Sequence, residues 1–100
     1  MPTITLKPDT NVRMAFTTSR NRWVTLELDA NHPVESYIVR PRGLEVFDEG
    51  RSTFRYYGGL ARPRRHHYQE LRLPFEGRWY LLIVNRNRTD TAKVRYEVTY

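Results

Sequence analysis

Two stretches decide the fold, WYLLIV at residues 79–84 and AKVRYEVTY at residues 92–100. In the second stretch, apolar side chains occupy every other position, with charged or hydroxyl side chains between them. This alternation is typical of an antiparallel strand with one face buried and the other in water. The first stretch is apolar on both faces and predicts a central strand covered on both sides. Residues 85–90, NRNRTD, predict an exposed loop that joins the two strands in a hairpin.

The same period of two recurs through the rest of the sequence. Further strands are predicted at residues 4–6, 13–17, 23–29, 34–39 and 68–73. Turn signals separate these runs, among them Asn31-His32-Pro33, Gly58-Gly59 and Pro63, and residues 44–50 favour a helical turn that crosses between sheets. We therefore expect an all-β fold, an antiparallel β-sandwich (jelly-roll-like) of seven to eight strands with at most one short helical turn. Its length fits a single β-sandwich domain over residues 1–100.

The composition indicates a basic, soluble protein. Seventeen basic residues, fifteen of them arginine, oppose eleven acidic ones and give a net charge of +6. Such a surface favours anionic partners, although arginine enrichment also arises without any binding role. Cysteine is absent, which excludes disulfides and thiolate metal sites. Without a signal-peptide pattern or a long apolar run, we expect a cytoplasmic protein with no membrane insertion.

The most unusual stretch is an arginine-rich loop predicted from Arg51 to Tyr68, which contains no acidic residue. Arginines interleaved with aromatic rings are what a site for nucleic acid, a nucleotide or another anionic ligand requires. The candidate binding residues are Arg51, Arg55, Tyr56, Tyr57, Arg62, Arg64, Arg65, His66 and Tyr68. A second interpretation is a cross-over loop whose rings plug one end of the core while its arginines are solvated.

The sequence predicts no catalytic residue, no metal ligand and no cofactor. Ser19, Ser36 and Ser52 lie in no nucleophile motif. The neighbours His66 and His67 would point to opposite faces of a strand, so we do not expect them to share a metal ion. A small hydrolase stays an alternative, because two carboxylates can meet in space without any sequence signature.

Three segments of the second half carry a resemblance to a known family. They are Phe54-Arg55-Tyr56-Tyr57-Gly58-Gly59, Leu71-Arg72-Leu73-Pro74 and Gly77-Arg78-Trp79-Tyr80. Together they resemble small bacterial β-sandwich domains of unknown function, which occur alone or fused to signalling domains of the Toll/interleukin-receptor type. More loosely, residues 77–100 are similar to the closing hairpin of pre-peptidase and Golgi-dynamics sandwiches. The resemblance covers roughly residues 51–100 and implies a bacterial origin and a signalling or defence context.

These observations predict a non-enzymatic interaction module. Its expected partner is another protein or a second copy of itself, bound through a sheet face or through residues 51–68. We expect the strand at residues 92–100 to lie at a sheet edge, where it can pair with another chain. Binding of nucleic acid or a nucleotide by the arginines of residues 51–68 is the alternative, and its steep salt dependence would distinguish it.

Overall fold

A computed structural model describes residues 2–51 and 53–100. The elements follow in the order β1 (Thr3–Leu6), β2 (Thr10–Thr18), β3 (Arg22–Val39), α1 (Pro41–Asp48), β4 (Gly58–Leu73), β5 (Gly77–Asn85) and β6 (Ala92–Thr99). Each strand pairing in this part of the chain is antiparallel. The sheet order is β1-β6-β3-β5-β2, and β4 pairs with β3. The predicted all-β, antiparallel sandwich-like fold is confirmed.

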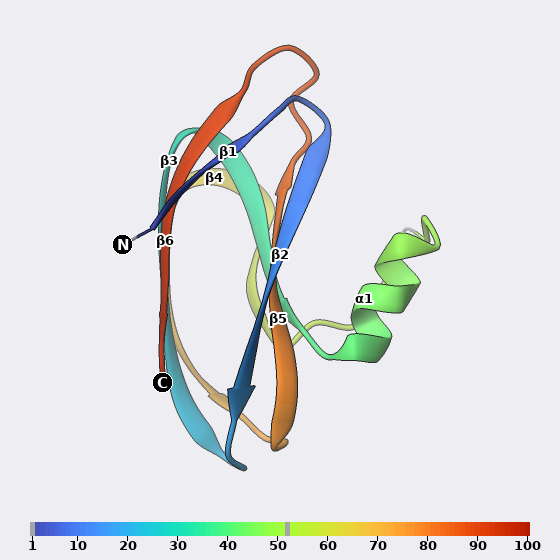
Figure 1. Cartoon of the computed structure of the whole chain (residues 1–100), viewed down its shortest axis with the longest axis vertical. Coiled ribbons are helices and arrows are strands. Elements are labelled where there is room, and N and C mark those ends of the chain that lie inside the picture. The colour runs from blue at the N-terminus through green and yellow to red at the C-terminus, as the bar shows by residue number, and fades with distance from the viewer. Residues whose placement is uncertain (1, 52) are drawn as a thin grey trace.

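The sheet curls into two layers that share β3 (Figure 1). Residues 25–30 of β3 pair with β6 in one layer, and residues 35–39 pair with β5 in the other. β4 pairs with β3 in both halves, from Arg22 to Ile38. β3 is therefore the strand that joins the two layers.

The main core lies between the layers and follows the predicted alternation. Leu26 and Leu28 of β3, Trp79 and Leu81 of β5, and Val94 of β6 are buried in it. Burial of each large apolar side chain contributes about 1.5–3 kcal/mol relative to exposure. Packing in this core therefore holds the two layers together.

A smaller apolar cluster covers the opposite face of β5. Its buried members are Tyr37, Val39, Leu44, Leu82 and Val84, and Phe47, Phe54 and Tyr80 pack against them. Because Leu44 and Phe47 belong to α1, this cluster docks the helix on the outside of the layer, as Figure 1 shows. The strand predicted to be covered on both faces is thus confirmed as β5.

α1 begins earlier than the helical turn predicted at residues 44–50, and it does not cross between the layers. Pro41 occupies the first helical turn, where its fixed φ angle is favourable and its missing N–H is not needed. Gly50 follows the helix with φ +78°, a conformation that suits glycine. At the end of α1, the Asp48 carboxylate accepts two hydrogen bonds from the Arg13 guanidinium of β2, at 2.6 and 2.8 Å. This bidentate pair ties the helix to β2.

The described chain has six strands, so the predicted number of seven to eight was wrong. The runs at residues 23–29 and 34–39 form one strand, β3, although Asn31-His32-Pro33 resembles a turn. The pairing of β3 with β4 shifts register between Asp29 and Val34, which accommodates these residues without ending the strand. Such irregularities bend a strand, and here the bend lets β3 pass from one layer to the other.

The predicted loop at residues 51–68 was also wrong from Gly58 onward, because β4 begins there. Pro63 is tolerated inside β4 because, among residues 2–51 and 53–100, this strand pairs with β3 alone and leaves its other edge without a ladder that would need the missing N–H. Gly59 has φ +103°, and a Cβ atom at this position would lie 2.6 Å from the carbonyl carbon of Ser36. Glycine at position 59 therefore allows the first residues of β4 to lie close enough to β3 to pair with it. Ser52 lies outside the described residues.

β6 is not a simple edge strand, contrary to the prediction. Its residues Ala92 to Arg95 pair with β1, and residues 94–99 pair with β3 on the other side. Only the last part of β6 extends beyond β1, so its free edge is short.

Candidate binding pocket

A pocket of about 520 Å³ lies where α1, the segment at residues 53–57 and the turn between β4 and β5 meet. Its described lining consists of Arg40, Arg42, Gly43, Val46, Thr53, Phe54, Arg55, Tyr57 and Phe75. We call it the arginine–aromatic pocket. Its volume is in the range of small-ligand sites, which is about 300–1,000 Å³.

Arg40 is held in a fixed position at one side of this pocket. Its guanidinium carbon lies 5.0 Å from the centre of the Trp79 ring and 5.7 Å from that of Phe75. One of its terminal nitrogens donates a hydrogen bond of 2.9 Å to the Glu76 carbonyl. Stacking on rings leaves the edges of a guanidinium available for an anion.

Arg55 is held in a similar way. Its guanidinium carbon lies 5.1 Å from the centre of the Tyr57 ring. That ring contacts the rings of Trp79 and Phe75 edge-on, with centroid separations of 5.0 and 5.9 Å. Since Trp79 is buried in the main core, the rings connect both arginines to that core.

The pocket is positively charged. Arg40, Arg42 and Arg55 line it, and none of its described lining residues carries a carboxylate. Arg42 approaches Glu45 at 3.4 Å, but both side chains are largely exposed, so this pair neutralises little of the charge. The pocket combines guanidinium groups with apolar rings and favours an anionic ligand.

The close approach of α1 to residues 53–57 depends on Gly43. A Cβ atom at position 43 would lie 2.6 Å from the Arg55 carbonyl oxygen. Because Gly43 has no side chain, the start of α1, which carries Arg42, can lie next to the segment that carries Arg55.

The structure separates the residues predicted to form one site. Arg55 and Tyr57 line the arginine–aromatic pocket, whereas Tyr56 packs against the Tyr37 ring at a centroid distance of 5.1 Å. Arg51 forms an ion pair with Glu49 at 3.2 Å. Phe54 and Tyr57 pack against the apolar clusters, as the interpretation of aromatic plugs predicts, whereas Tyr56 is 44% exposed. Arg55 lines the pocket.

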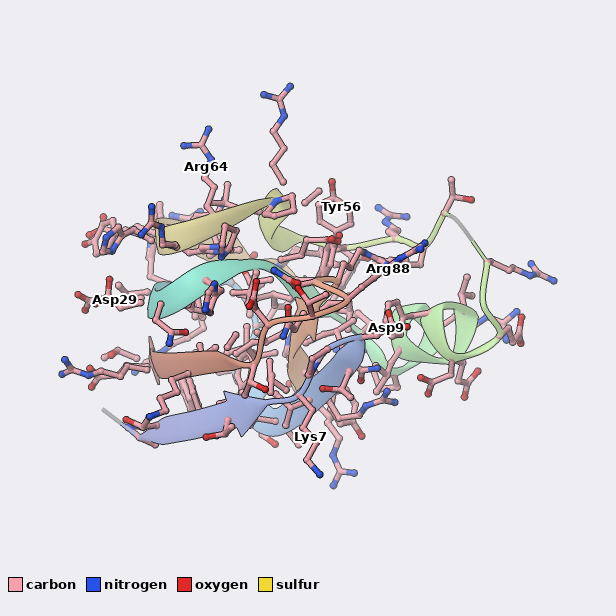
Figure 2. All side chains as sticks on the ribbon, turned by 90° about the horizontal axis from the view of Figure 1, so that it is seen from above. Lys7, Asp9, Asp29, Tyr56, Arg64 and Arg88 are labelled. Atoms are coloured by element: carbon pink, nitrogen blue, oxygen red, sulfur yellow. The ribbon has the colours of Figure 1, made fainter. Side chains whose placement is uncertain are left out.

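The other predicted residues lie along β4. Arg62, Arg64 and Arg65 are exposed, and Figure 2 shows Arg64 pointing away from the sandwich. His66 contacts the Asp29 carboxylate, and the Tyr68 hydroxyl donates a hydrogen bond of 2.7 Å to Glu70. That carboxylate raises the pKa of Tyr68. None of these residues of β4 lines the arginine–aromatic pocket.

Sequence reasoning missed Arg40, Arg42 and Phe75. Arg42 belongs to the Pro41-Arg42-Gly43 segment, which has the form of a turn, and Phe75 follows Pro74, another turn signal. An arginine on each side of a proline at residues 40–42 was the one local signal of basic character. Their convergence with Arg55 depends on tertiary packing, which no local pattern reveals.

A serine–histidine pair is buried between β3 and β4. Ser36 is 0% and His67 2% exposed, and their Oγ and Nδ1 atoms are 2.5 Å apart. His67 Nε2 donates to the Arg64 carbonyl at 3.0 Å, so Nδ1 accepts from the serine hydroxyl. Burial lowers the pKa of His67. This pair is enclosed and fully hydrogen-bonded, which makes it a structural feature of the β3–β4 pairing.

A buried carboxylate is compensated nearby. Glu35 is 5% exposed; it lies 2.6 Å from Arg86 Nε and accepts a hydrogen bond from the Tyr37 hydroxyl. Burial and this hydrogen bond raise the pKa of Tyr37. The contacts fix the start of the β5–β6 loop against β3.

Residues 2–51 and 53–100 contain no group of three or more His, Cys, Asp or Glu placed to hold a metal ion. In the same part of the chain, no helix has the length and apolarity needed to cross a membrane.

No protein-family model matches the chain, and no curated protein matches it in sequence. The resemblance to small bacterial β-sandwich domains therefore stays a prediction, as do the bacterial origin and the cytoplasmic location.

Proposed function

We propose that this chain is a non-enzymatic binding module that recognises an acidic segment of a protein partner in the arginine–aromatic pocket. The observation that carries the proposal is the pocket's lining of three arginines without a described carboxylate. Guanidinium groups bind carboxylates in a bidentate geometry. Arginine and aromatic side chains also contribute most of the binding energy at many protein interfaces. Because Arg40 and Arg55 are already stacked on rings, binding orders few side chains and loses little entropy.

The state of the buried polar groups supports a role without catalysis. A nucleophile or a general base has to be within reach of a substrate. Ser36 and His67 are enclosed, and the Glu35 carboxylate is occupied by Arg86 and Tyr37. These groups therefore support a stable sandwich, whereas the accessible charged groups support binding.

A fluorescein-labelled glutamate decapeptide tests the proposal by fluorescence anisotropy, with a glutamine decapeptide as neutral control. Arg55→Gln removes the charge and keeps a polar side chain. It is expected to weaken binding about tenfold, since a hydrogen bond to a charged group contributes about 1.5–3 kcal/mol.

Arg62→Gln is the matched control, because it removes the same charge from an exposed site on β4. Its expected effect is less than about twofold. Equal weakening by both substitutions would contradict the proposal, because binding would then depend on net charge and not on the pocket.

A second candidate function is nucleic-acid binding on β4. Arg62, Arg64 and Arg65 are exposed there, and no ion pair joins them to a carboxylate in the described residues. An oligothymidylate shift assay at about 50 and about 200 mM salt tests this function, because phosphate contacts weaken steeply with salt. Arg64→Gln should then weaken binding, while Arg55→Gln should leave it unchanged.

A further inference from the structure

We infer that the acidic segment bound in the arginine–aromatic pocket carries a large apolar side chain close to its carboxylate. This inference rests on the proposed function and adds the second group that the pocket recognises.

The first argument is the apolar wall of the pocket. Phe75 is 47% exposed, whereas the neighbouring Trp79 ring is fully buried and the Tyr57 ring is half-buried. Its ring lines the pocket together with Phe54, Tyr57 and Val46. A volume of about 520 Å³ is far more than one carboxylate fills. An apolar group entering this space would cover the Phe75 ring and remove it from water.

The second argument is the position of the charges relative to the rings. Arg40 stacks on Phe75, and Arg55 stacks on Tyr57. The two rings contact each other edge-on. Charged and apolar surfaces are therefore adjacent, so a ligand that uses both presents its anionic and apolar groups within a short stretch of chain.

The third argument separates a peptide from a nucleotide. Arginines and rings can hold the phosphates and the base face of a nucleotide, but recognition of a ribose or of an adenine or cytosine edge commonly adds carboxylate or amide side chains. Apart from the arginines, the described lining residues offer only the hydroxyl groups of Thr53 and Tyr57 as polar side-chain groups, and none has an amide or a carboxylate. This lining suits an apolar side chain better than a nucleoside.

A set of labelled peptides tests the inference by fluorescence anisotropy. Each peptide has a glycine–serine backbone with one aspartate and one phenylalanine, either adjacent or separated by one or two residues. Control peptides replace the aspartate with asparagine or the phenylalanine with serine, and fluorescent ATP serves as the nucleotide probe. For the peptide whose spacing binds most tightly, replacing either its aspartate or its phenylalanine is expected to weaken binding about five- to tenfold.

Substitutions in the protein assign each group to its partner. In Arg55→Gln, replacing the peptide aspartate should have little further effect, because the two groups no longer interact. In Phe75→Ser, replacing the peptide phenylalanine should have little further effect for the same reason. Arg62→Gln should preserve both effects. The thermal midpoint of each variant shows whether it is folded.

The outcomes separate the inference from the proposed function. If the serine-substituted peptides bind as tightly as their parents, the inference is wrong and binding of an acidic segment stands. If ATP binds in an Arg55-dependent manner and the peptides do not, the ligand is a nucleotide and the inference is wrong. If neither the peptides nor the glutamate decapeptide bind, the proposed function itself fails. Because the peptide controls use unaltered protein, a misfolded Phe75→Ser variant would leave the test intact.

Discussion

Replacing Gly59 with alanine forces a Cβ atom into the backbone of β3. The new atom would lie 2.6 Å from the Ser36 carbonyl carbon and 2.7 Å from the Tyr37 Cα atom. Real Cβ atoms essentially never approach other heavy atoms closer than 3.0 Å. Because both neighbours are backbone atoms, the strands themselves have to move apart. Gly50→Ala is the matched control, since Gly50 also has a positive φ but nothing lies within 4 Å of its Cβ position.

The two substitutions share one unfavourable contribution and differ in the other. A non-glycine residue at positive φ costs about 1–2 kcal/mol. At Gly59, displacement of the start of β4 also strains the hydrogen bond of 2.6 Å from the Gly59 N–H to the Gln69 side chain and that of 2.8 Å from the Tyr57 N–H to the Ile38 carbonyl. Each net hydrogen bond contributes about 1 kcal/mol, and overpacking adds about 1–3 kcal/mol. We expect a loss of roughly 4 kcal/mol for Gly59→Ala against roughly 1 kcal/mol for Gly50→Ala.

Urea unfolding followed by tryptophan fluorescence measures both losses, because Trp79 becomes exposed on unfolding. A loss of roughly 4 kcal/mol is a large part of the 5–15 kcal/mol that stabilises a typical domain. Equal midpoints for the two variants would refute the close approach of β4 to β3 at this position.

Three other substitutions test separate features of the fold. Burial lowers the pKa of His67 below its ordinary value of 6.5, so as the pH falls the unfolded chain binds a proton before the folded one does, and the folded protein loses stability below about pH 6.5. Urea unfolding at about pH 7.5 and 5.5 measures this loss, which should be smaller in His67→Gln than in the unaltered protein. Asp48→Asn removes the charge from the pair with Arg13 and should cost about 0.5–1 kcal/mol, with faster hydrogen exchange in α1. Arg86→Ala leaves the buried Glu35 carboxylate without its cation and should cost about 2 kcal/mol in urea unfolding; adding Glu35→Gln should restore part of it.

The strands that alternate cleanly were predictable from sequence, and the others were not. β6 and β5 follow their patterns because one or both faces of each are buried in apolar cores. β3 was divided in two because Asn31-His32-Pro33 has the composition of a turn, while the structure absorbs it in a register shift. Residues 58–67 of β4 were missed because an exposed edge strand rich in arginine has no alternating pattern to find.

The candidate site was predictable only in part for a similar reason. Arg55 and Tyr57 belonged to the stretch selected for its arginines and rings, and both line the pocket. Arg40 and Phe75 are distant from them in sequence, and stacking on shared rings brings them together. Arg62, Arg64 and Arg65 do not line this pocket, because β4 carries them away from it along the sheet.

The position of β3 also determines how the molecule unfolds. β3 hydrogen-bonds to β4, β5 and β6, and its partners are remote in sequence, such as Arg22 with Leu73 and Thr25 with Thr99. Chains with such non-local pairings fold slowly, in milliseconds to seconds. Neither layer can open alone without breaking contacts of β3. We therefore expect the amide protons of β3 to exchange more slowly than those of the other strands. Arg40 follows β3 directly, and its backbone is therefore anchored to the part of the chain that opens last.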